Sequence, residues 1–236
     1  MTVTESGKQQ YRVKTYARRE SRITPAQKRA LAELLSLYEL PLTESPIRLS
    51  EVFPGTIRFA IEIGFGDGET LVHQAQQNKT TAYLGIEVYR PGVGKCLLQL
   101  HKNNVKNVRV STNDARDVVL QQVPPNAVNE FMILFPDPWP KLRHRKRRLV
   151  NSEFVELCVN RLVIGGTILV VTDSSDYAQQ VLEILEENPN LESMAPGQDA
   201  AGVQDKLWQT RYARKASQSG NQVFELLYTR SAYRST

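Results

Sequence analysis

From Arg58 onward, short apolar runs alternate with segments in which apolar residues recur every three or four positions. Short apolar runs predict buried strands, and the helical period predicts amphipathic helices. The runs predict strands at 58–63, 81–87, 107–111, 128–135, 167–172 and 222–228. The periodic segments predict helices near 68–78, 91–103, 114–121, 151–162 and 174–187.

Alternation of strands with helices predicts an α/β fold, a doubly wound and mostly parallel sheet. Runs such as FMILF and ILVV are continuously apolar, as expected of strands that helices cover on both faces. The polar segment 188–207 is predicted to be a long loop.

The N-terminal residues differ from the rest of the chain. Residues 1–22 are predicted to form a flexible basic arm because they contain few residues that a core could bury. Thr24 and Pro25 are typical of a helix start, and one apolar face then continues to a helix end before Pro41. A chain of 236 residues suits one sizeable core, so residues 23–236 are predicted to form a single domain.

Composition and charge favour a folded protein that binds a polyanion. Hydrophobic residues make up 41% and charged residues 23%, which excludes a disordered chain. The formal net charge is +5, but residues 1–30 hold eight Lys or Arg against two acids, and residues 141–148 hold six and no acid. The remaining residues are therefore net acidic. Such concentrated positive charge favours nucleic acid as a partner, with an anionic membrane surface second.

The two cysteines, Cys96 and Cys158, form no CxxC pair or metal-ligand spacing. They predict neither a disulfide framework nor a metal site. The N-terminus lacks an apolar export segment, and the longest apolar run, 162–171, is interrupted by Gly165 and Gly166. We therefore expect a cytoplasmic protein without a membrane span.

The segment AIEIGFGDGET (60–70) places a buried strand directly before three alternating glycines. Ligands of this fold bind at the carboxyl ends of the strands, where glycines allow close approach to the backbone. The spacing is GxGxG rather than the dinucleotide GxGxxG, and Asp67 and Glu69 place negative charge where a phosphate would bind. The loop, with Glu62 beside it, therefore favours a cationic ligand such as S-adenosylmethionine.

Two further acids follow the next strands. Glu87 ends the second strand, where an acid can hold ribose hydroxyls, and Asp114 follows the third, where it could accept from an adenine amino group. A helix N-cap or a solvated loop charge is the alternative for each acid taken alone. Acids at successive strand ends together favour a ligand site.

The fourth strand ends in FPDPWP (135–140), which we call the proline corner. Three prolines fix their own φ angles and are expected to hold Phe135, Asp137 and Trp139 in extended conformations. Asp137 would thus be positioned beside the ligand with little freedom left to lose. Trp139 could stack on an unpaired base, but we favour packing in the core.

Residues 141–148, the basic segment, follow the corner directly. Its cations could contact phosphates that flank a target nucleotide. A solvated helix face is the alternative, which we disfavour because no acids interleave the run.

These motifs together resemble the bacterial tRNA (guanine-N7-)-methyltransferases, members of the class I S-adenosylmethionine-dependent methyltransferases. The resemblance rests on EIGFG, GIEV, the Asp-Ala after the third strand, FPDPWPK with its basic tail, and RRESRITPAQKRAL. It implies a Rossmann-like fold and methyl transfer from S-adenosylmethionine to a guanosine N7 in tRNA, at position 46 of the variable loop. It also implies tRNA as the partner. No metal is expected, and the sequence leaves open whether the chain is a monomer or a homodimer.

The resemblance also implies a role for particular residues. Asp137 is the implied catalytic acid, and the implied cofactor-binding residues are Glu62, Gly64, Gly66, Glu87, Asp114 and Asp137. The implied guanosine-binding residues are Lys141, Asp173, Thr210, Arg211, Tyr212 and Ala213. The implied RNA-binding residues are Arg143, His144, Arg145, Lys146, Arg147 and Arg148. Ala213 stands where the family carries a glutamate, so activity would be weakened unless Glu225 or Asp205 compensates.

Guanine N7 has an in-plane lone pair and no proton, so its methylation needs positioning rather than a general base. Asp137 could accept hydrogen bonds from the guanine edge and offset positive charge on the purine ring. Three alternatives are a nicotinamide oxidoreductase, a catalytically weakened RNA-binding protein on a methyltransferase scaffold, and a methyltransferase for another RNA or base.

Overall fold

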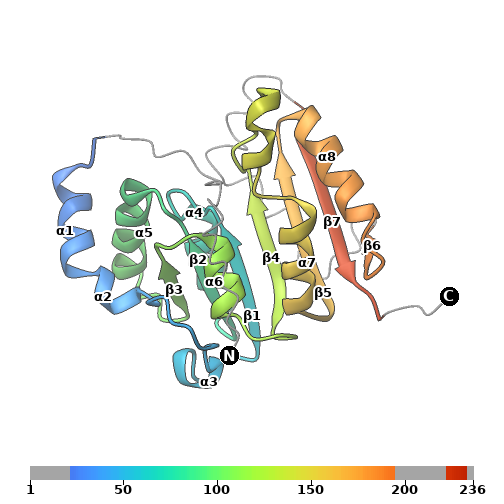
Figure 1. Cartoon of the computed structure of the whole chain (residues 1–236). Helices are drawn as coiled ribbons and strands as arrows, with labels where there is room; N and C mark the ends of the chain where they lie inside the picture. Colours follow the sequence, from blue (N-terminus) through green and yellow to red (C-terminus); the bar gives the residue numbers. More distant parts are fainter. Residues whose placement is uncertain (1–21, 195–221, 233–236) are drawn as a thin grey trace, which may run out of the picture.

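A seven-stranded sheet forms the centre of the computed structural model, which describes residues 22–194 and 222–232 (Figure 1). Its strand order is β3-β2-β1-β4-β5-β7-β6. The strands from β3 to β5 are parallel, and β7 runs antiparallel to both of its neighbours. The strands are β1 Arg58–Ile63, β2 Thr81–Ile86, β3 Val108–Ser111, β4 Val128–Leu134, β5 Leu162–Thr172, β6 Leu191–Ser193 and β7 Phe224–Arg230.

Helices cover the sheet on both faces. The helices are α1 Pro25–Glu33, α2 Leu35–Tyr38, α3 Leu49–Val52, α4 Glu69–Gln77, α5 Arg90–Lys102, α6 Ala115–Gln121, α7 Ser152–Arg161 and α8 Ser175–Glu186, with the 3-10 helix η1 Leu142–Arg147. The prediction of a doubly wound, mostly parallel α/β fold is confirmed.

Alternate residues of each strand enter two separate hydrophobic clusters. Ile61 and Ile133 pack with α6, α7 and α8, whereas Ala60 and Met132 pack with α1, α4 and α5. This period of two follows from strand geometry, and it gives each face of the sheet its own buried hydrophobic cluster. Figure 1 shows α1 and α5 side by side at one end of the sheet and α8 at the other. The carboxyl ends of β1 to β5 are thereby held at one edge.

The first helix starts as predicted and then breaks. Thr24 caps α1 through a reciprocal capping box with Gln27. The predicted continuous helix up to Pro41 is divided, because the chain turns at Leu34 before α2 begins. Of the predicted face, Ala30, Leu31 and Tyr38 are buried.

Two other predictions are corrected. Strand β5 begins at Leu162 rather than at 167, and its pairing with β4 shifts register between Val128 and Glu130. The glycines at 165 and 166 therefore interrupt the register and not the strand. The predicted loop 188–207 contains β6, because Leu191–Ser193 finds a partner in β7 that local sequence cannot reveal.

The basic arm, residues 1–22, lies outside the described residues except for its last residue, so the predicted domain division stays a prediction. No helix within residues 22–194 and 222–232 combines the length and hydrophobicity that a membrane span requires. Within the same residues, no group of three His, Cys, Asp or Glu side chains gathers as metal ligands. Cys96 and Cys158 are buried free thiols.

Candidate functional site

Four acids lie at or just after the carboxyl ends of successive parallel strands, at one edge of the sheet that we call the acid edge. Glu62 is on β1, Glu87 follows β2, Asp114 precedes α6 and Asp137 follows β4. The order β3-β2-β1-β4 makes these four strand ends neighbours. The prediction that the acids share one edge is confirmed.

The glycine loop, residues 64–68, bends over this edge. Gly64 and Gly66 have φ angles of +77° and +55°, which side chains other than glycine rarely adopt. A Cβ built at either residue would meet no atom within 4 Å, so the space above the loop is open. Glu87 holds the loop in place, accepting from the backbone N–H of Gly66 at 2.9 Å and of Tyr89 at 2.8 Å.

Glu62 is a buried acid with an unsatisfied acceptor. Its side chain is 2% exposed, and its Oε2 has no hydrogen-bond partner among the described residues. Burial, together with the charges of Glu87 and Glu130, raises the pKa of Glu62 to about 8. A buried acceptor without a partner is costly, so this atom indicates a missing donor or cation.

Three of the acids lie close enough for their charges to shift one another's pKa. Burial raises the pKa of Glu87 against its backbone hydrogen bonds, and the charge of Asp137 raises it further. Glu87 in turn raises the pKa of Glu62. The fourth acid, Asp114, caps α6 by accepting from Arg116 N at 2.9 Å through Oδ1. Its capping role and a ligand role are compatible, because Oδ2 takes no part in the cap.

Lys95 partly offsets the negative charge of Asp67 and Glu69. Lys95 Nζ lies 2.7 Å from Asp67 and 3.5 Å from Glu69, so one lysine offsets much of their charge. Their presence therefore does not by itself exclude a phosphate. Glu62, Glu87 and Asp137 contribute further negative charge at the same edge of the sheet.

The proline corner is rigid, but its conformation differs from the prediction. Phe135 and Trp139 have φ angles of +51° and +42° and are not extended. Phe135 N donates to Val171 O at 2.7 Å, which continues the pairing of β4 with β5 past the end of the strand. Tertiary contacts of this kind outweigh the local preference of a residue before proline.

Trp139 is half-buried and does not lie in the core, contrary to the expectation. The Arg147 guanidinium lies over its ring at 4.9 Å, and the His144 ring meets it edge-on at 5.8 Å. The basic segment therefore folds back as η1 against the proline corner.

Arg148 was predicted to contact RNA, and the structure contradicts this. Its side chain is 1% exposed. It donates to Pro138 O at 2.8 Å, to Gln180 at 2.5 Å and to the Asp176 carboxylate, and it stacks on Tyr177. A guanidinium with five donors satisfies these acceptors together, so Arg148 fastens the proline corner to α8.

The other cations of the basic segment remain near solvent. Lys141, Arg143 and Lys146 are exposed and form no ion pair with a described residue, while Arg145 pairs with Asp176. Desolvation and the charges of Arg147, Arg143 and Lys141 lower the pKa of His144. At neutral pH His144 is therefore a neutral hydrogen-bonding group rather than a cation.

The remaining predicted residues lie beside the acid edge or outside the described part. Asp173 is exposed directly after β5, the neighbour of β4. Glu225 is exposed on β7 opposite Val171, near the same strand end. Thr210, Arg211, Tyr212, Ala213 and Asp205 lie outside the described residues.

Sequence reasoning missed the residues that support the site. Asp176 and Gln180 on α8 anchor Arg148, and the hydrogen bond from Arg148 is the main cause that lowers the pKa of Asp176. An acid in the first turn of a helix suggests only a favourable contact with the helix dipole. Neither residue carries a local pattern that points to Arg148.

Comparison with known proteins assigns the family and the fold. A family model described as "Putative methyltransferase" matches residues 58–226. A tRNA (guanine-N(7)-)-methyltransferase of Alkalilimnicola ehrlichii is 38% identical, with 92% of each chain covered. One of Nitrosococcus oceani is 37% identical, over 93% of this chain and 91% of that one.

Solved structures share the fold at low identity. An rRNA methylase of Streptococcus thermophilus aligns with a TM-score of 0.52 and 14% identity, covering 78% of this chain and 92% of the other. The 16S rRNA methyltransferase KamB aligns with a TM-score of 0.53 and 16% identity, covering 78% and 93%. The sheet and helices described above are therefore those of a Rossmann-like methyltransferase.

Proposed function

Because this chain belongs to the tRNA (guanine-N(7)-)-methyltransferase family, we propose that it methylates N7 of a guanosine in tRNA, with S-adenosylmethionine as donor. The observation that carries the proposal from the structure is the unpartnered, buried Oε2 of Glu62 below the open glycine loop. A cationic methyl donor would give this oxygen the favourable electrostatic partner that it lacks among the described residues. The variable loop, at position 46, is the target that the family resemblance implies.

The residues of the acid edge fit this cofactor. Glu62, Gly64, Gly66, Glu87, Asp114 and Asp137 would hold it. The cofactor supplies an electrophilic methyl group when bound. Glu87 keeps acceptor capacity beyond its two backbone hydrogen bonds, because each carboxylate oxygen can accept more than one. Its ionised form suits sugar hydroxyls, and Asp114 suits an exocyclic amino group.

The chain's own contribution to methyl transfer is positioning and charge. Guanine N7 carries no proton, so no residue has to act as a base, and alignment of the reacting groups can contribute about 7–11 kcal/mol. Asp137 is held between Pro136 and Pro138 in a corner that Arg148 fastens to α8. We propose that its carboxylate accepts from the guanine edge and stabilises the positive charge that develops on the ring.

The exposed cations of the basic segment lie beside this corner. Lys141, Arg143 and Lys146 would contact phosphates, which supply affinity without sequence information. His144, Arg145 and Arg147 belong to the same segment. Lys141 and Asp173 are the proposed contacts to the target guanosine. Arg148 is omitted from this surface because it is buried.

The direct test is incubation of the purified protein with bulk tRNA and labelled S-adenosylmethionine, followed by mass spectrometry of the nucleosides. We expect labelled 7-methylguanosine in tRNA and no labelled 7-methylguanosine in rRNA incubated in parallel. Asp137→Asn should lower single-turnover methyl transfer at saturating tRNA and leave tRNA binding unchanged. Binding of tRNA without any methyl transfer would instead favour the weakened RNA-binding protein, for which Ala213 is the sequence argument.

We further propose that the protein works in the cytoplasm, which two free thiols support. A monomer or a homodimer stays a prediction.

A further inference from the structure

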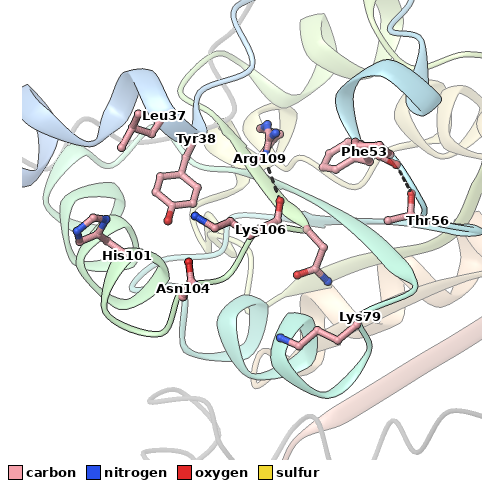
Figure 2. Close-up of a pocket in the computed structure, with 11 residues that line it drawn as sticks. Leu37, Tyr38, Phe53, Thr56, Lys79, His101, Asn104, Lys106 and Arg109 are labelled. Carbon is pink, nitrogen blue, oxygen red and sulfur yellow. Dashed lines mark hydrogen bonds between the residues drawn. The ribbon is translucent and has the colours of Figure 1, made fainter.

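A second candidate site lies at the opposite edge of the sheet, where β1, β2 and β3 begin. Residues of α2, of the turn after α3, of the turn before β2 and of the segment from α5 to β3 surround a hollow of about 640 Å³ (Figure 2). We call it the amino-edge groove. None of the residues of the acid edge or the basic segment lines it.

The charge of the groove has one sign. Lys79, Lys106 and Arg109 line it together with His101, and no Asp or Glu does. Lys79 and Lys106 are exposed. Lys79 comes from the turn before β2, whereas Lys106 and Arg109 come from the start of β3 and the turn before it, so the three cations are not the solvated face of a single helix. Like charges that converge on one hollow repel each other, and an anion there would relieve the repulsion.

The floor of the groove is fixed before any ligand arrives. Arg109 donates to Lys106 O at 3.1 Å and to Val108 O at 2.9 Å, and its guanidinium lies 5.6 Å from the centre of the Phe53 ring. Asn107 donates to the carbonyl oxygens of Ala75, Asn78 and Thr81, which ties the start of β3 to α4 and β2. A fixed guanidinium loses little conformational entropy when it binds an anion.

The remaining walls suit a ligand that is not purely ionic. Leu37 is 60% exposed, and Pro54, which is also exposed, belongs to the same lining. They offer apolar contact next to the cations. The hollow is concave, which does not suit the flat surface of a membrane.

We propose that the amino-edge groove binds a phosphate-bearing ligand whose phosphates contact Lys79, Lys106 and Arg109 and whose apolar part contacts Leu37 and Pro54. Three cations match a ligand with several anionic phosphate oxygens better than a single carboxylate. The ligand is a nucleotide unit, either free in solution or part of the tRNA backbone. The site is separate from the acid edge. With a free nucleotide as ligand it does not depend on the function proposed above, and with the tRNA backbone as ligand it rests on that function.

The experiment measures binding of two probes, uridine diphosphate by equilibrium dialysis and bulk tRNA by filter binding at several salt concentrations. Saturating S-adenosylhomocysteine is present throughout so that the probe nucleotide cannot occupy the cofactor site. The test variant is K79Q/K106Q. The matched control is K102Q, because Lys102 is exposed at the end of α5 but does not line the groove.

If the ligand is a free nucleotide, K79Q/K106Q should weaken uridine diphosphate binding about tenfold or more, whereas K102Q should bind it like the wild type. If the ligand is the tRNA backbone, K79Q/K106Q should reduce the steepness of the plot of log K for tRNA binding against log salt concentration by about 1.8, since each lost phosphate contact removes about 0.9. Circular dichroism should confirm that both variants fold, because the substituted lysines are exposed.

The proposal is overturned if K79Q/K106Q matches K102Q with both probes. It is also overturned if substitution of Lys141, Arg143 and Lys146 by glutamine abolishes uridine diphosphate binding, because the probe would then occupy the basic segment.

Discussion

Glu62→Gln should show how much the buried carboxylate of Glu62 destabilises the folded protein. The pKa of Glu62 is raised from the ordinary 4.5 to about 8, mainly by burial. Below pH 4.5 both the folded and the unfolded chain carry the proton, and above about pH 8 neither does. Between these values folding takes up a proton, so the free energy of unfolding falls as the pH rises.

The size of this effect follows from the pKa. Each pKa unit is worth about 1.4 kcal/mol, so the rise from 4.5 to about 8 corresponds to about 5 kcal/mol at full ionisation. Glutamine has nearly the same shape and no charge. We therefore expect Glu62→Gln to match the wild type near pH 4.5 and to become more stable by several kcal/mol towards pH 8.

Urea unfolding of the ligand-free protein at pH 5, 6, 7 and 8 measures this difference. Glu33→Gln is the control, because Glu33 is an exposed glutamate on α1. A stability difference between Glu62→Gln and the wild type that stays constant from pH 5 to pH 8 would refute the reasoning.

The same residue predicts how ligand binding depends on pH. S-adenosylhomocysteine carries a positively charged amino group near neutral pH, which favours the ionised form of Glu62. Its binding should therefore release a proton and should weaken from pH 7.5 to pH 6, by at most about tenfold per pH unit. Titration calorimetry in two buffers of different ionisation enthalpy measures the released proton, which should be absent in Glu62→Gln. Equal proton release in both proteins would exclude Glu62 as its source.

The other predictions concern the supports of the site. Arg148→Met should destabilise the fold by about 2–4 kcal/mol in urea unfolding and lower single-turnover methyl transfer, because buried acceptors lose their donor. Exposed Arg143→Met should stay within about 0.5 kcal/mol of the wild type; equal losses would contradict the anchoring role of Arg148. Gly92→Ala should weaken S-adenosylhomocysteine binding in calorimetry, because the new Cβ would lie 2.3 Å from a carbonyl of the glycine loop; unchanged affinity would show that this packing is dispensable. Substitution of Lys141, Arg143 and Lys146 by glutamine should reduce the salt slope of tRNA binding by about 2.7; an unchanged slope would exclude these phosphate contacts.

Much of the acid edge could be predicted because its determinants are local. Strand periodicity, the glycine spacing and an acid at each strand end are all properties of neighbouring residues. Parallel strands in a doubly wound sheet bring their carboxyl ends to one edge, so Glu62, Glu87 and Asp137 meet wherever this strand order holds. The positive φ angles of Phe135 and Trp139 were not predictable, since contacts made elsewhere in the fold impose them.

By itself, the sequence determined the α/β alternation, the acids and glycines of the cofactor edge, and the family resemblance. Only the tertiary structure decided which charges are available. In the run RKRR, Lys146 faces solvent while Arg148 is buried, and Lys95 offsets the charge of Asp67 from 28 residues away. It also gathered Lys79, Lys106 and Arg109 around one groove. The reason is physical, because burial and charge pairing depend on distances in space, which the spacing of residues along a chain does not fix.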